Sequence, residues 1–151
     1  MSKANTRPLT PRLICKDAKK AIDFYVQALG AKVLEQFEDK HLGIIVHSAL
    51  EVNGGIFAVV DSAPDWGNHS PSDIGGTAVL MQLIVDDPDT TGKQMEQLGA
   101  EVVFPIADQF YGHREGRLRD PFGHLWMITK IVEELSPEEI QRRVDSFHDA
   151  G

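Results

Sequence analysis

The sequence has little of several features that would define its class. One cysteine, Cys15, occurs in 151 residues, so no disulfide can form within the chain, which suits a reducing compartment. No apolar run approaches the roughly 20 residues that a membrane-spanning helix needs. The N-terminal segment MSKANTRPLTPRL lacks the apolar core of a secretion signal. We therefore expect a cytoplasmic protein, with Cys15 buried in its apolar run LIC as a structural thiol.

Positive charge is also scarce. The chain has 15 Lys and Arg residues against 23 Asp and Glu residues, a formal net charge of −8. This excess of negative charge disfavours sequence-independent binding to nucleic acid or to anionic membranes. The hydrophobic share of 42% and the charged share of 25% are ordinary for a globular protein, so we expect one folded domain.

What the sequence does contain is an internal repeat. The segment QALGAKV at 27–33 returns as EQLGAEV at 96–102, which places Gly99 69 residues after Gly30. The same spacing relates further pairs: Asp17 with Asp86, Gly54 with Gly123, and Ile56, Phe57 and Val59 with Leu125, Trp126 and Ile128. Such self-similarity predicts a duplicated supersecondary unit.

Each copy has the pattern of a βαβββ unit. In the first, strands are expected in 8–15, 31–39, 41–52 and 55–60, with a helix from Asp17 to Gly30 and a tight turn at Asn53-Gly54. In the second, strands are expected in 77–85, 100–104 and 124–132 and around 112–120, with a helix in 87–99. A sheet with one helix leaves one face uncovered, so the two copies are expected to form cupped mixed sheets around a central cavity. The expected fold class is α+β.

The remaining segments connect or follow these units. We expect a single domain with repeat one at about 8–61, repeat two at about 77–131 and a linker loop at 61–76. The linker is rich in Gly, Pro, Ser and Asp, and both a binding loop and a simple tether remain open for it. Ser136 and Glu139 form a capping-box pattern around Pro137, which predicts a C-terminal helix at 136–148.

Two motifs within these units, FYVQALGA and RDPFGHLW, resemble the vicinal-oxygen-chelate superfamily, which includes glyoxalase I, extradiol dioxygenases, fosfomycin-resistance enzymes and bleomycin-binding proteins. The chain is most similar to the PhnB-like glyoxalase/bleomycin-resistance branch, in segments 9–31, 108–129 and 133–143. The resemblance implies a small-molecule site inside the cupped sheets and a homodimer. Whether the cavity forms within one chain or across the dimer stays open.

The resemblance also bears on metal binding. Metal-using relatives place ligands on inward positions in the first and last strands of each copy, which here fall near Thr10, Ala58, Val79 or Leu80, and Met127. None of these residues is His, Asp, Glu or Cys, the ligand types that a catalytic divalent ion requires. We therefore expect neither a metal site nor a cofactor.

Without a metal, the cavity is expected to be an apolar pocket with a few polar groups. The candidate ligand-binding residues are Phe57, Trp66, Phe110, Tyr111, His113, Trp126 and Met127. Because side chains alternate along a strand, Trp126 and Met127 cannot both face the cavity. His41 and His47 lie six residues apart, and we expect them on a solvated strand face.

Three functions remain open. The leading hypothesis is a metal-free binding protein that sequesters an apolar or aromatic toxic compound. The alternative is a glyoxalase-like lyase or isomerase, either metal-dependent or using His113, paired with Glu115 or Asp108, as a general base. A solvated charged hairpin would explain the same three residues without chemistry. The third hypothesis is an interaction subunit with a vestigial pocket.

Overall fold

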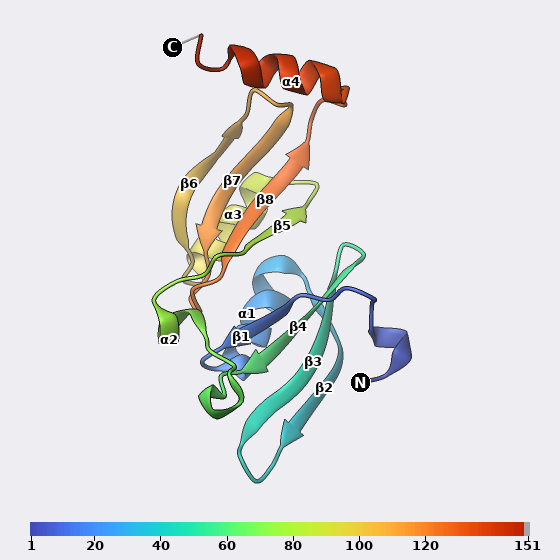
Figure 1. Ribbon diagram of the computed structural model, residues 1–151, viewed down its shortest axis with the longest axis vertical. Coiled ribbons are helices and arrows are strands. Elements are labelled where there is room, and N and C mark those ends of the chain that lie inside the picture. The colour runs from blue at the N-terminus through green and yellow to red at the C-terminus, as the bar shows by residue number, and fades with distance from the viewer. Residues whose placement is uncertain (150–151) are drawn as a thin grey trace.

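The computed structural model of the protein describes residues 1–149 and consists of two modules arranged along its long axis (Figure 1). The first module contains β1 (Arg12–Cys15), α1 (Ala18–Leu29), β2 (Lys32–Asp39), β3 (Ile44–Val52) and β4 (Gly55–Asp61). The second contains β5 (Leu80–Ile84), α3 (Pro88–Gln97), β6 (Glu101–Asp108), β7 (His113–Arg119) and β8 (Leu125–Ile131). The predicted duplication of a βαβββ unit is confirmed.

Each module forms one four-stranded mixed sheet. The strand orders are β1-β4-β3-β2 and β5-β8-β7-β6, and in each sheet the first strand of the module runs parallel to the last. Helix α1 packs on the first sheet and α3 on the second, and both helices lie behind the sheets in Figure 1. The faces turned toward the viewer, which we call the open faces, carry neither of these helices.

The two helices begin and end as their sequences predict, with one shift. The Asp17 side chain caps α1 by accepting from the Lys20 backbone N–H, and Gly30 ends the helix with φ 70°. Helix α3 is capped by Asp87, the first residue of the expected segment 87–99, and Gly99 again has positive φ, 108°. The caps are therefore one residue further apart than the glycines. As a result Arg12 in β1 corresponds to Gln82 in β5.

The linker, expected as a loop, contains two short helices, η2 (Pro64–Trp66) and α2 (Pro71–Ile74). Helix α2 forms because Ser70 and Asp73 make a reciprocal capping box and Pro71 occupies the first turn. It packs closely on the β7–β8 turn: a Cβ added at Gly123, where φ is 93°, would lie 2.7 Å from Pro71 Cβ.

Within residues 1–149, two further helices lie outside both the modules and the linker. The C-terminal helix, α4 (Pro137–Ser146), is capped by Ser136 and ends two residues before the expected boundary. A short 3-10 helix, η1 (Lys3–Asn5), precedes β1. No helix within residues 1–149 has both the length and the apolar character needed to cross a bilayer.

The modules are joined by a buried aromatic cluster. The Tyr25 ring of α1 contacts Phe57 of β4 and Trp126 of β8, with ring centroids 5.5 and 5.4 Å apart, and Phe57 and Trp126 are 5.6 Å apart. Cys15 is fully buried beside this cluster, and burial raises the pKa of its thiol well above the usual value. Aromatic pairs of this kind contribute packing energy beyond the area they bury.

A single carboxylate, Asp120 in the β7–β8 turn, completes this junction. It is 3% exposed and accepts hydrogen bonds from Tyr25 Oη, from Trp126 Nε1 at 2.9 Å and from the backbone N–H groups of Phe122 and His124 at 2.9 and 3.0 Å. A buried charge is tolerated only when it is satisfied in this way. The bond from Tyr25 ties the first module to the second.

Replacing Tyr25 by Phe should lower the free energy of unfolding by about 1–3 kcal/mol, because the buried Asp120 carboxylate loses one donor. Urea denaturation followed by circular dichroism measures the change. Thr6→Val is the control: it also removes one hydroxyl donor, but from an exposed hydrogen bond to the Ser2 carbonyl, where water can replace it, so a smaller loss is expected. Equal stability of Tyr25→Phe and the wild type would contradict the role assigned to this bond.

Candidate functional site

The open face of the second module holds a pocket of about 210 Å³. Its lining residues come from β6, β7, β8 and the β6–β7 turn: Phe104, Gln109, Tyr111, Glu115, Gly116, Arg117 and Met127. On neighbouring strands Glu115 lies opposite Thr129 and Arg117 opposite Met127. Because side chains alternate along each strand, these four side chains share the face opposite α3.

The centre of the pocket is the Glu115 carboxylate, which is 5% exposed. It accepts hydrogen bonds from Thr129 Oγ1 at 2.5 Å, from Tyr111 Oη, and from Gln82 Nε2 at 3.5 Å. These donors come from β8, the β6–β7 turn and β5, so three segments hold one carboxylate in place. The arrangement presents a buried negative charge at the base of an otherwise largely apolar pocket.

Tyr111 responds electrostatically to this carboxylate. Burial raises the pKa of its phenol, and the hydrogen bond to Glu115 and the charge of Glu115 raise it further, to about 12. Tyr111 is therefore a hydrogen-bond donor to Glu115 at neutral pH. Its hydroxyl is not available as a base.

Two polar atoms beside the pocket have no hydrogen-bond partner among the described residues: His113 Nδ1 and Arg117 Nε. His113 Nδ1 lies 3.6 Å from Glu115 Oε2, beyond hydrogen-bonding distance. The Arg117 guanidinium stands over the Phe104 ring at 5.4 Å from its centroid. Both atoms are buried, and Arg117 lines the pocket whereas His113 does not.

The structure brings together some of the residues singled out in the sequence. Tyr111 and Met127 line the pocket, and the His113 ring contacts Tyr111 with centroids 5.1 Å apart. Phe110 instead stacks on Phe147 beyond α4, at 4.4 Å. Trp66 lies in η2, is 57% exposed and does not line this pocket.

Phe57 and Trp126 belong to the interior rather than to the pocket. They are 3% and 2% exposed and pack against Tyr25 of α1. The reason is strand parity: in β8 the side chain of Met127 points to the open face, so its neighbour Trp126 points toward the helices.

A second polar cluster, on the open face of the first module, has no counterpart in the sequence-based predictions. His47 was expected on a solvated face, but it is 8% exposed, and its ring lies between Arg12 and Glu35. Arg12 Nη1 is 3.1 Å from His47 Nδ1, and His47 Nε2 is 3.2 Å from Glu35 Oε1. An arginine can only donate, so His47 accepts at Nδ1 and donates from Nε2 to Glu35.

The charges in this cluster are fixed by their surroundings. Burial lowers the pKa of His47, because it penalises the charged imidazolium, and the nearby Arg12 lowers it further. Burial by itself would raise the pKa of Glu35, but hydrogen bonds from Ser2, Asn5 and His47 hold it at about 2. At neutral pH the cluster therefore has a positive Arg12, a neutral His47 and a negative Glu35.

The fold and both open faces can now be compared with known proteins. The family model described as "Glyoxalase/Bleomycin resistance protein/Dioxygenase superfamily" matches residues 8–128. The chain belongs to this superfamily. The uncharacterized protein Mb0911c of Mycobacterium bovis is 38% identical over 149 residues, covering 96% of this chain and 97% of that protein.

Solved structures of other proteins have a similar fold. TioX from Micromonospora sp. ML1 has a TM-score of 0.61 and 26% identity, covering 86% of this chain and 100% of that chain. The fosfomycin resistance protein FosX from Listeria monocytogenes, in a complex with Mn(II) and sulfate, has a TM-score of 0.61 and 18% identity, covering 89% of this chain and 96% of that chain. At this identity the likeness to FosX concerns the fold alone.

The residues at the inward positions of this superfamily chain do not suit a divalent ion. The strand register changes two of the expected positions: Arg12 pairs with Ala58 and Gln82 pairs with Met127, so Arg12 and Gln82 take the places expected for Thr10 and for Val79 or Leu80. A guanidinium, a methyl group, an amide and a thioether make a poor ligand set for a hard or borderline cation. Within residues 1–149 no group of three or more His, Cys, Asp and Glu side chains could hold a metal ion.

Replacing Glu115 by Gln should lower the pKa of Tyr111 from about 12 toward its ordinary value of 10, since it removes the negative charge beside the phenol. The chain has two tyrosines, and burial raises the pKa of the other, Tyr25, far above this range. Ultraviolet absorbance titration therefore reports Tyr111 alone. An unchanged titration would contradict the contact, and Glu138→Gln on exposed α4 is the control.

Proposed function

We propose that the protein binds a small apolar or aromatic molecule, without a metal ion, on the open face of the second module. The observation that carries the proposal is the buried Glu115 carboxylate at the base of a pocket walled by Phe104, Tyr111 and Met127. Apolar walls with a few fixed polar groups are characteristic of small-molecule sites. A ligand with a positive group or a hydrogen-bond donor complements Glu115.

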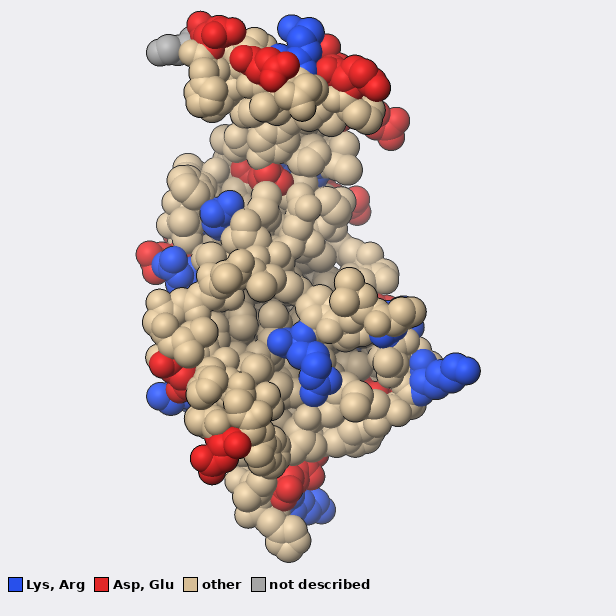
Figure 2. Space-filling model, in the orientation of Figure 1, with Lys and Arg blue, Asp and Glu red and all other residues tan. Residues whose placement is uncertain are grey.

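We further propose that a second copy of the chain closes this pocket, as the homodimer expected from the resemblance. Both open faces point the same way (Figure 1), and Figure 2 shows that much of this side of the molecule is free of charged side chains. Phe37, which stacks on His47, is 43% exposed, and Phe104 is 58% exposed. A second copy that covered these faces would remove both apolar rings from water. Sedimentation velocity distinguishes this dimer from a monomer with open sheets.

The biological role that fits such a pocket is sequestration of a toxic compound, including an antibiotic, in the cytoplasm. A protein that only sequesters needs affinity and no reacting group. The DPFGH and SPEE motifs at 120–124 and 136–139 support placing the chain in the PhnB-like branch of the superfamily. The net charge of −8 favours cationic ligands through long-range attraction.

A second candidate is a lyase or isomerase of the glyoxalase type with His113 as general base. The observation in its favour is the 3.6 Å separation between His113 Nδ1 and Glu115 Oε2. A carboxylate at Nδ1 would orient the ring and leave Nε2 to accept a proton, and such contacts tighten when substrate binds. His113→Gln would then abolish turnover while leaving affinity nearly unchanged, whereas a binding protein has no turnover to lose.

A panel of cationic aromatic compounds, read by thermal shift and isothermal titration calorimetry, should yield at least one ligand. Glu115→Gln should weaken its binding roughly tenfold or more, because a buried charge-assisted hydrogen bond is lost. Glu138→Gln on α4 removes the same charge from an exposed site and should leave affinity unchanged. Silence across a broad panel, or equal losses in both variants, would contradict the proposal.

Protein purified without chelators or affinity metals should contain far less than one equivalent of Ni, Zn, Mn or Fe. The reason is the ligand set at the inward positions, Arg12, Ala58, Gln82 and Met127. Inductively coupled plasma mass spectrometry measures the content. One equivalent of any of these metals, retained through dialysis, would favour the metal-dependent enzyme instead.

A further inference from the structure

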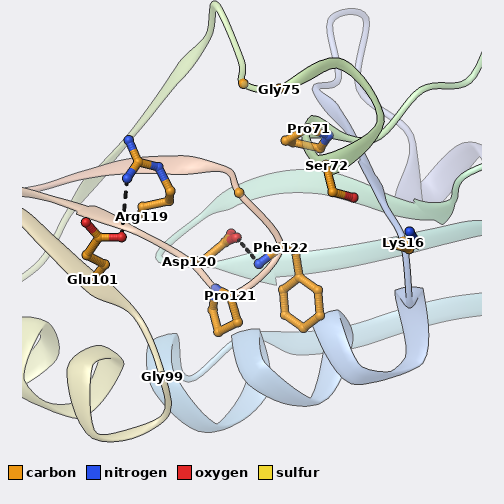
Figure 3. A pocket seen from close by; sticks show the side chains of 12 residues that line it. Lys16, Pro71, Ser72, Gly75, Gly99, Glu101, Arg119, Asp120, Pro121 and Phe122 are labelled. Atoms are coloured by element: carbon orange, nitrogen blue, oxygen red, sulfur yellow. Dashed lines mark hydrogen bonds and ion pairs between the residues drawn. The ribbon is translucent and has the colours of Figure 1, made fainter.

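A larger cavity, of about 600 Å³, lies where the two modules and the linker meet (Figure 3). One wall comes from the end of β1, another from β6 and β7, and a third from α2 and the glycines that follow it. The β7–β8 turn, Asp120 to Gly123, forms its floor. This cavity is separate from the pocket around Glu115, and none of its lining residues is shared with that pocket.

Two cationic side chains, Lys16 and Arg119, stand on opposite sides of this cavity (Figure 3). Lys16 forms no ion pair with any residue in the described part of the chain. Arg119 has one carboxylate partner there, Glu101, at 3.4 Å, and both side chains are largely exposed. An exposed pair of this kind contributes little stability, so Arg119 can exchange Glu101 for another anion.

The lining also has two acidic residues, Asp120 and Glu101. Both oxygens of Asp120 already accept hydrogen bonds, from Tyr25, Trp126 and two backbone N–H groups, and these partly offset its negative charge. The carboxylate of Glu101 competes directly with an anion, because it is paired with Arg119. The chain as a whole has a net charge of −8, which repels anions at long range. Lys16 and Arg119 nevertheless place two positive charges beside the same cavity.

The rest of the lining suits a flat organic body. The Phe122 ring and Pro121 provide apolar surface on the floor, and Pro71 faces them from α2 (Figure 3). Ser72 adds a hydroxyl on the same side as Lys16. Gly75 adds no side chain to the lining, and the space beside it is open, because a Cβ added there would meet no atom within 4 Å.

We propose that this junction cavity binds a small aromatic or apolar molecule with an anionic carboxylate or phosphate group, held between Lys16 and Arg119. Charge-assisted hydrogen bonds from a guanidinium and an ammonium are the strongest contacts such oxygens make in proteins. A ligand in this position would contact both modules and the linker. It would differ in charge from the ligand proposed for the Glu115 pocket, so the two proposals stand or fall separately.

Phenyl phosphate and benzoate, with inorganic phosphate for comparison, test the site by titration of ¹⁵N-labelled full-length protein. Shifts are expected at the amides of Gly75, Gly76 and Gly123, and phenyl phosphate against benzoate distinguishes the two anionic groups. Lys16→Gln and Arg119→Gln should each weaken binding roughly tenfold or more, the loss expected for a charge-assisted hydrogen bond. Glu101→Gln should strengthen binding, because it frees Arg119 and removes the competing carboxylate.

Lys130→Gln, an exposed charge change on β8, is the matched control and should bind as the wild type does. Because the Glu101 and Arg119 variants are expected to act in opposite directions, general destabilisation cannot produce the predicted pattern. The proposal is overturned if none of the probes shifts the junction amides, if the shifts fall at Tyr111 and Met127 instead, or if Lys130→Gln weakens binding as much as Lys16→Gln.

Discussion

The structure depends on how one buried carboxylate is satisfied. Asp120 accepts hydrogen bonds from the hydroxyl of Tyr25 in the first module and from the indole of Trp126 in the second, and all three residues are buried. A charge in this position would be strongly destabilising without its donors, so the geometry of the junction is narrowly defined. Helices α1 and α3 cover one face of each sheet, so the open faces remain available for other contacts.

The two open faces have different chemistry even though the modules share a fold. The first carries the Arg12–His47–Glu35 cluster, in which both charged groups already have a hydrogen-bond partner in His47. The second carries Glu115, whose donors are neutral, with the unpartnered Nδ1 of His113 and Nε of Arg117 beside it. A ligand therefore has more to gain on the second face. The first face is better suited to closing over it.

Local signals in the sequence were enough to predict the fold. The repeated LGA segment, the aspartate caps and Asn53-Gly54 each act within a few residues, and the structure has them where they were expected. The site was harder to predict, because Glu115 meets Gln82 and Thr129 from strands distant in the sequence. The inward positions of β1 and β5 were expected at Thr10 and at Val79 or Leu80, but the strand register places Arg12 beside Ala58 and Gln82 beside Met127. Trp126 lies in the interior because its neighbour Met127 faces the other side of β8.

The junction also shows how the two repeated units differ. At the 69-residue spacing Asp120 corresponds to Glu51 in the first half. At the 70-residue spacing that relates the helix caps, Tyr25 corresponds to the buried Met95 in the second half. The hydrogen bond between the halves thus joins Tyr25 of the first half to Asp120 of the second, and the repeat does not reproduce it between the equivalent residues. Two copies of the second half would bring the thioether of Met95 to the carboxylate in place of a phenol, and a thioether has no hydrogen to donate. The two repeated units therefore differ at this contact, and neither unit can replace the other in forming it.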